Sequence, residues 1–210
     1  MKKLLGILAI SALASGAFAQ GLVGFLNNSA GYVTQWTSST DPTPIRVAVG
    51  GGMVELLTAP ANTPFTALGT LSASGFSSPY STLEAFLTAN PGWQSVASVG
   101  FTTPAAGRFN GGTVTLQGAI TGGANAEYVI IGWTGAATTW DAALTTAGTF
   151  FGTGPMTTTT TGSGGVPPIA ATLLSGSFTG MTLAPMVPEP ASFALVGLGL
   201  AALVALRRRS

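Results

Sequence analysis

The sequence predicts an all-β fold, either a sandwich or a barrel, because short strand-like stretches alternate with glycine-rich turns. The clearest alternation lies in residues 112–120, where the apolar side chains share one face and the polar side chains share the other. Residues 127–133 are apolar on both faces, which is typical of a central strand. Because only the turn 121–125 separates these two stretches, we expect them to form a hairpin.

A second hairpin is predicted within residues 45–57. Its strands are residues 45–49 and 53–57, and the three glycines 50–52 between them supply the positive φ angles that a tight reversal needs. Further strands are expected at residues 22–26, 65–71, 95–101 and 177–183.

Two short helices are expected beside the strands. Ser81 and Glu84 have the spacing of a capping box, and the Asn-Pro-Gly sequence at 90–92 provides a stop for that helix. Thr138-Thr139-Trp140-Asp141 is predicted to begin the second helix. Glu84 and Asp141 then lie in first turns, where a carboxylate complements the helix dipole.

The composition favours one exported domain that is stabilised by its core. Charged residues make up 6% of the 210 residues, against about 25% in an average globular protein. There is no cysteine, so stability must come from core burial rather than from disulfides. Between the two ends of the chain the only cations are Arg46 and Arg108, and this scarcity argues against nucleic acid as a partner.

Residues 1–19 have the pattern of a secretory signal peptide. Two lysines precede an apolar stretch, which ends in the small-x-small arrangement of Ala17 and Ala19 that signal peptidase recognises. We therefore expect the mature chain to begin at Gln20. The alternative is an N-terminal core helix or membrane anchor, although the apolar run is short for a membrane span.

The C-terminal segment 187–210 combines three features. Residues 191–206 carry no charge, and as a helix they would cover about 24 Å of a hydrocarbon core of about 30 Å, which local thinning can accommodate. They are followed by Arg207, Arg208 and Arg209, which are expected to stay cytoplasmic, so that the rest of the protein faces outward. They are preceded by an expected extended strip of Val187, Pro188, Glu189 and Pro190.

These three features, in this order, resemble the sorting signal of PEP-CTERM proteins, a family of exported bacterial proteins. The resemblance implies recognition by exosortase, a membrane-embedded enzyme that is thought to cut near the motif and to pass the protein to the cell surface. The alternative is a C-terminal anchor that is never processed. The order of strands, with Gly132-Trp133 and then Trp140-Asp141, also resembles the extracellular part of many PEP-CTERM proteins, and this looser similarity implies an immunoglobulin-like or jelly-roll β sandwich.

The residue types exclude most catalytic designs. With no histidine and no cysteine, the commonest general base, the thiol nucleophile and the usual zinc ligands are missing, so we expect no enzyme activity, no metal and no cofactor. A pair of carboxylates for glycoside hydrolysis is the remaining alternative. Its candidates are Asp41, Glu55, Glu84, Glu127 and Asp141.

Two surface features are also predicted. Among the four tryptophans, Trp36 is the candidate for exposure and for contact with a glycan, because it lies in a polar segment, whereas core packing is expected for the group as a whole. A flexible loop is predicted at 156–165 because of its threonines and glycines. Its candidate O-glycosylation sites are Thr157, Thr158, Thr159, Thr160 and Thr161.

Together these observations predict three parts: a signal peptide at 1–19, a β-sandwich domain at 20–186 and a sorting signal at 187–210. The expected protein is a non-enzymatic component of the cell surface or extracellular matrix with a structural or adhesive role in an exopolysaccharide biofilm. Its expected partners are signal peptidase, exosortase, the membrane and exopolysaccharide. The alternative function is that of a carbohydrate-binding module at the cell surface.

Overall fold

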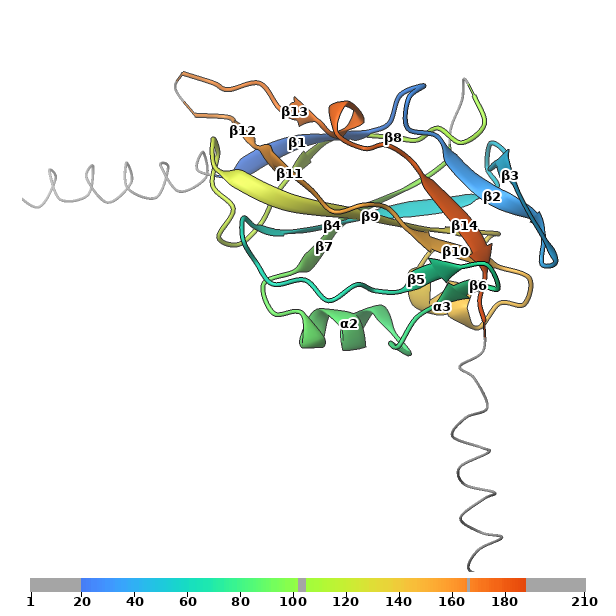
Figure 1. Ribbon diagram of the computed structural model, residues 1–210. Coiled ribbons are helices and arrows are strands. Elements are labelled where there is room, and N and C mark those ends of the chain that lie inside the picture. The colour runs from blue at the N-terminus through green and yellow to red at the C-terminus, as the bar shows by residue number, and fades with distance from the viewer. Residues whose placement is uncertain (1–19, 102–104, 166, 188–210) are drawn as a thin grey trace, which may run out of the picture.

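The computed structural model describes residues 20–101, 105–165 and 167–187. These residues are mostly β-structure and form a sandwich of two sheets with a separate small hairpin (Figure 1). The larger sheet has eight strands in the order β3-β2-β14-β10-β9-β4-β7, and β11 also pairs with β9. In that order the strands are Asp41–Arg46, Val33–Ser38, Met181–Pro185, Phe150–Thr153, Asn125–Thr134, Gly52–Pro60 and Gln94–Gly100, while β11 is Thr157–Thr160.

The smaller sheet is built around β1, Gly21–Leu26. Its partners are β8 (Asn110–Thr115), β12 (Gly162–Ser163) and β13 (Thr172–Leu173), and the separate hairpin consists of β5 (Thr70–Ser72) and β6 (Gly75–Ser77). Two pairs are parallel, β14 with β2 and β1 with β13. An immunoglobulin domain has antiparallel sheets of three and four strands, so the strand count and the parallel pairs here differ from that arrangement.

A first hydrophobic core lies between the two sheets. The smaller sheet contributes Val23 and Phe25, and the larger sheet contributes Leu56, Ile130 and other alternate residues of its strands. Phe109 packs between Phe25, at a ring-centroid distance of 5.1 Å, and Phe178, at 5.8 Å. Such aromatic contacts add to the area that the core buries.

A second core covers the opposite face of the larger sheet. Helices α2 (Leu83–Ala89) and α3 (Trp140–Leu144) and the hairpin β5–β6 lie below that face in Figure 1. The core contains Phe86 of α2, Trp140 of α3 and Trp133 of β9. As a result, β9 is buried at every position after Asn125, and the predicted central strand is confirmed.

The predicted hairpin of residues 112–120 with 127–133 is wrong. β8 pairs with β1 in the smaller sheet, whereas β9 pairs with β4, β10 and β11 in the larger one. The two stretches therefore lie on opposite sides of the first core. Alternation in a sequence indicates which side chains face the core, but it does not indicate the sheet from which they face it.

The predicted hairpin within residues 45–57 is also wrong, although its turn exists. Gly50 has a φ of 71°, and the Gly51 N–H donates to the Ala48 carbonyl at 2.9 Å. The strand before the turn, β3, pairs with β2, while β4 pairs with β7 and β9. The glycines thus redirect the chain between non-neighbouring strands.

The remaining predicted elements are mostly confirmed. Strands were expected at 22–26 and 95–101, where β1 and β7 lie, but β14 begins at Met181 rather than at Ser177, and residues 65–69 form no strand. Phe65 lies in this irregular segment, and its ring packs against Phe86 and Trp93.

Both predicted helices are present. α3 begins within the predicted stretch 138–141: Thr139 caps it, and Asp141 lies in its first turn, as expected. The N-cap of α2 is Thr82, whose hydroxyl accepts from the Ala85 N–H at 3.0 Å. The predicted capping box of Ser81 and Glu84 is therefore wrong, because the cap lies one residue later than Ser81. Glu84 remains a first-turn acid, and the helix stops at Asn90 as expected.

Within the part of the chain that the structure describes, no helix is long and apolar enough to cross a membrane. The predicted signal peptide, including Ala17 and Ala19, lies outside the described residues, as do the predicted tail helix 191–206 and the arginines 207–209. The first described residue, Gln20, forms an antiparallel bridge with Thr121.

Candidate functional site

The end of β14 carries the chain to the first residue of the predicted sorting strip. β14 pairs with β10 and β2, and beyond it Met186 forms a parallel bridge with Phe76 of β6. The Val187 N–H then donates to the Phe76 carbonyl at 2.8 Å. The first residue of the strip, Val187, is therefore hydrogen-bonded to the folded body. The other three residues of the strip, Pro188, Glu189 and Pro190, lie outside the described residues.

The hairpin β5–β6 approaches this chain end closely because β6 begins with a glycine. Gly75 has a φ of 134°, and a Cβ atom at this position would lie 2.5 Å from the Pro185 carbonyl oxygen and 2.8 Å from Cγ2 of Val187. Only glycine allows such an approach without a shift of the backbone. The hairpin thus holds the last residues of the body in place.

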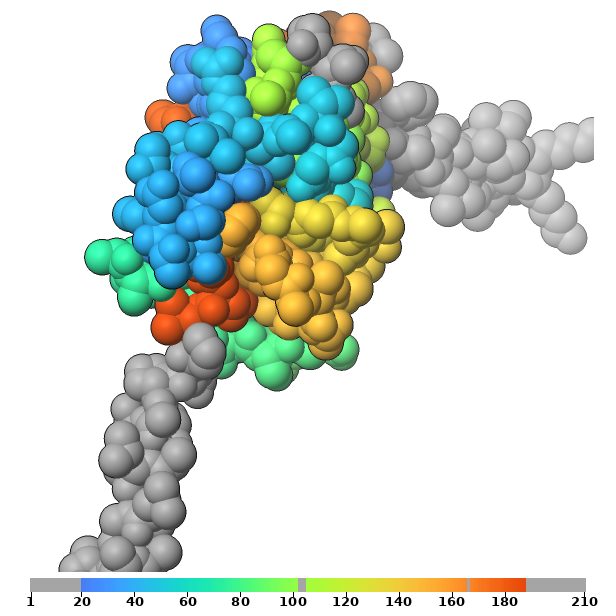
Figure 2. Space-filling view, turned by 90° about the vertical axis from the view of Figure 1, so that its right-hand side faces the viewer, coloured from blue at the N-terminus to red at the C-terminus, as the bar shows by residue number. Residues whose placement is uncertain are grey.

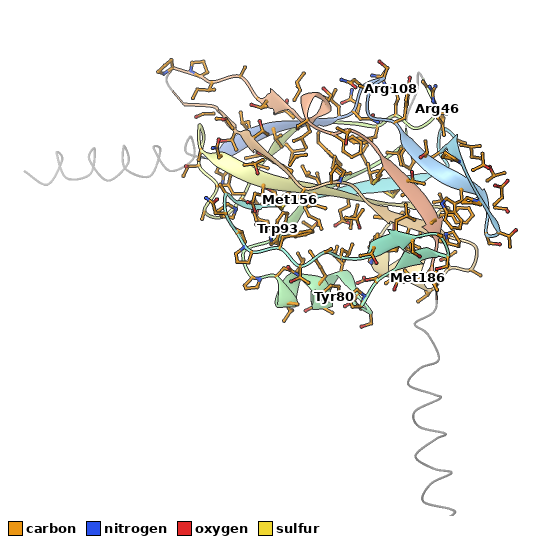
Figure 3. The ribbon with its side chains drawn as sticks, viewed as in Figure 1. Arg46, Tyr80, Trp93, Arg108, Met156 and Met186 are labelled. Carbon is orange, nitrogen blue, oxygen red and sulfur yellow. The ribbon has the colours of Figure 1, made fainter. Side chains whose placement is uncertain are left out.

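A cavity of about 440 Å³ lies beside this chain end, and we call it the exit pocket. It is lined by Ser78, Pro79, Tyr80, Ser81, Leu144, Met186 and Val187. The Tyr80 ring makes an edge contact with Phe86 at 5.4 Å, which fixes this wall against α2. Tyr80 and Met186 lie at the end of the body where the chain leaves (Figure 3), and this end forms the lower edge of the space-filling view (Figure 2).

A second cavity, of about 330 Å³, brings together three of the five predicted carboxylates. Glu55, Glu84 and Asp141 line this acidic pocket, together with parts of α2 and α3. The Asp141 carboxylate accepts from the Leu83 N–H at 2.7 Å and so joins the two helices, while Glu55 accepts a hydrogen bond from the Ser95 hydroxyl.

The other two carboxylates lie elsewhere and support turns. Asp41 accepts from the Thr43 N–H at 3.0 Å, and this hydrogen bond lowers the pKa of its carboxyl group. Glu127 is 6% exposed and accepts from the N–H of Asn62, a residue with positive φ, at 2.8 Å. Each of these acids therefore has a structural role in the turn that it supports.

The carboxyl group of Glu55 is in an unfavourable environment for a charge. Glu55 is 8% exposed, and burial raises its pKa, while the Ser95 hydrogen bond lowers it and the nearby charge of Asp141 raises it further. A carboxyl whose pKa is higher in the folded state binds its proton more tightly there. The free energy of unfolding should therefore decrease as pH rises from the ordinary pKa of the group through its raised folded-state pKa.

We expect Glu55→Gln to raise the melting temperature at pH 7, because the amide can still accept from Ser95 and no charge is buried. A gain of about 1 kcal/mol corresponds to about 2–4 °C for a domain of this size. Thermal unfolding between pH 4 and 8 measures the effect, which should become smaller toward acid pH. Glu84→Gln, on the exposed first turn of α2, is the control and should lower stability slightly. An unchanged melting temperature at pH 7 for Glu55→Gln would contradict the assigned electrostatic cost.

The tryptophans do not form an exposed platform. Trp36 is 5% exposed and packs in the second core, so its predicted exposure is wrong. The segment around it is β2 rather than a loop, and strand alternation turns Trp36 inward while Thr37 points outward. Core packing is confirmed for Trp93, Trp133 and Trp140, which belong to the same core.

The predicted threonine loop is also wrong, because residues 157–160 form β11 and pair with β9. β-branched threonines suit a strand, and in this case the partner strand outweighs a composition that is typical of loops. Thr158 and Thr160 are exposed, whereas Thr161 is fully buried and its hydroxyl donates to the Thr121 carbonyl at 2.8 Å. Thr161 is therefore not an accessible glycosylation site.

Sequence reasoning did not identify the residues around the chain end. Gly75, Phe76 and Tyr80 lie far from Val187 in the sequence and form no recognisable motif with it. The one local feature that could have indicated this site is Gly75, which lies between short serine-containing stretches. Glycines in such surroundings are common in this chain, so the feature is not specific. Only the pairing of β6 with the residues after β14 makes these residues part of the site.

Comparison with known proteins adds one finding. No curated protein and no solved structure matches the chain. Residues 187–209 match a family model that is described as the PEP-CTERM protein-sorting motif. The chain therefore carries the sorting signal of the PEP-CTERM family, which implies an exported protein with exosortase as its sorting partner and a membrane-anchor region at its C-terminus.

Proposed function

We propose that this protein is a non-enzymatic component of the cell surface or extracellular matrix, released from the membrane by exosortase, with a structural or adhesive role in an exopolysaccharide biofilm. The observation that carries the proposal is the sorting motif, which follows directly from the last strand of a β-rich body. In this proposal residues 1–19 are removed on export and the body 20–186 is the part that remains at the surface.

The composition of the body supports a structural rather than a catalytic role. Three of the five carboxylates that a glycosidase could use have structural contacts: Asp41 and Glu127 support turns, and Asp141 joins α2 to α3. The surface strand β11 exposes the hydroxyl-bearing residues Thr158 and Thr160, which suit O-glycosylation or hydrogen bonds to a polysaccharide. Adhesion through such hydroxyls needs no catalytic group.

The experiment that tests the proposal is the intact mass of the surface form from its native host. We expect a chain that lacks residues 1–19 and the tail 191–210. Pro188→Ala with Pro190→Ala should allow a helix to extend into the strip, so most of the protein should stay in the membrane with its tail attached. The same double change at the exposed Pro167 and Pro168 is the control and should leave sorting unchanged. Surface protein that retains Ser210 would instead indicate an anchor that is never processed.

A further inference from the structure

The distance between the folded body and the membrane-anchor region is short. Val187 is hydrogen-bonded to Phe76, and only Pro188, Glu189 and Pro190 separate it from Ala191, where the uncharged run begins. Even fully extended, the chain from Val187 to Ala191 covers at most about 14 Å. No flexible linker therefore separates the body from the sorting motif.

An enzyme that binds the motif must therefore come close to the body. A strip of three residues is shorter than the diameter of a small domain, so an enzyme that encloses it meets whatever surface surrounds Val187. The alternative is that the chain first detaches from β6. The hydrogen bond of Val187, the bridge of Met186 and the close approach of Gly75 all oppose such detachment.

The surface around Val187 is suited to a protein partner. The exit pocket is lined by the apolar residues Pro79, Leu144 and Met186 together with two serines. The cores of protein–protein interfaces are enriched in aromatic residues and methionine, and Tyr80 and Met186 supply both to this pocket.

The charges of the body argue against an anionic lipid surface at this position. Arg46 and Arg108, the only cations of the sequence between residues 4 and 206, lie at the opposite end of the body from Tyr80 and Met186 (Figure 3). Glu84 and Asp141 line the neighbouring acidic pocket on α2 and α3. Anionic lipids attract basic segments, and no basic side chain is available here.

We propose that the exit pocket is a docking surface for exosortase, so that the enzyme contacts the folded body together with the sorting motif. The proposal rests on the proposed function, because it requires that the tail is processed. If exosortase contacts this pocket, residues at its rim should affect how efficiently the tail is processed. The exposed Ser81 is such a residue.

The test changes Ser81 to Arg and, separately, to Glu in the full-length protein of the native host. Both side chains are larger and carry opposite charges, so a loss in both variants indicates filling of the rim rather than a charge effect. We expect at least a fivefold decrease in the ratio of processed surface protein to tail-bearing membrane protein. The controls are Ser29→Arg and Ser29→Glu, on the exposed loop between β1 and β2 at the other side of the body, and these should be processed like the wild type (Figure 1).

A spacer provides the second measurement. Ten Gly and Ser residues inserted between Met186 and Val187 add a mean reach of about 17 Å, so the enzyme can bind the motif without contact with the body. With the spacer, the Ser81 variants should be processed as well as the spacer protein that has Ser81. Thermal unfolding verifies that each variant is folded.

The outcomes separate the two proposals. Normal processing of both Ser81 variants overturns the docking surface and leaves sorting intact. A defect that persists with the spacer also overturns it, because the effect then does not depend on contact between the enzyme and the body. A wild type that is never processed overturns both the docking surface and the proposed function.

Discussion

Ile130→Asp should leave the protein unable to fold. Ile130 is 3% exposed, lies in β9 and faces the first core, where the structure provides no cation to pair with a new carboxylate among the residues of that core. Burial of an unpaired charge is far more costly than loss of the isoleucine packing, and changes of this kind exceed about 4 kcal/mol. That loss is comparable to the whole stability of an average domain, about 5–15 kcal/mol.

Circular dichroism and thermal unfolding measure the effect. The matched control is Ile45→Asp, at a side chain of β3 that is 44% exposed, where the carboxylate remains in water and stability should change by less than about 0.5 kcal/mol. A cooperative transition near the wild-type temperature for Ile130→Asp would contradict the assignment of β9 as the central strand.

Asn27→Ala should have the second largest effect. Asn27 is 1% exposed, and its Nδ2 group donates to the carbonyls of Gly31 at 2.7 Å and Gly107 at 2.9 Å. Its Oδ1 atom accepts from the Phe109 N–H at 2.8 Å. The alanine variant removes the side-chain partner of the Gly31 carbonyl and of the Phe109 N–H, and each such group costs about 1–3 kcal/mol when it is left buried and unpaired. The Gly107 carbonyl loses one of two donors but keeps the Val33 N–H at 2.9 Å, so we expect a loss of at least about 2 kcal/mol.

Asn27→Asp separates the two directions of hydrogen bonding. The carboxylate can still accept from Phe109, but it cannot donate and it faces the two carbonyl oxygens of Gly31 and Gly107, so this variant should be strongly destabilised as well. Asn110→Ala is the control, because the Asn110 side chain is exposed and accepts a local hydrogen bond from the Gly112 N–H at 3.0 Å. Chemical denaturation compares all three variants, and an Asn27→Ala protein as stable as Asn110→Ala would show that the three bonds contribute little.

Local patterns predicted several elements because their cause is local. Alternation located β8, and an apolar pattern on both faces identified β9. Hydroxyl residues ahead of apolar ones located α2 and α3 within one residue of their caps. Threonine in β11 shows the limit of this reasoning. Its composition is typical of a loop, yet the free backbone edge of β9 provides a partner that makes the segment a strand.

By itself, the sequence determined the β-rich class, the two helices and the sorting signal, because each depends on the spacing of neighbouring residues or on a short motif. Only the tertiary structure decided that β8 pairs with β1 rather than β9, that Trp36 is buried, that Asn27 joins three segments, and that Phe76 holds Val187. These contacts join residues that are far apart in the chain. Each depends on which surfaces meet across the two cores, and a local pattern indicates the face that a side chain takes but not the partner that it meets.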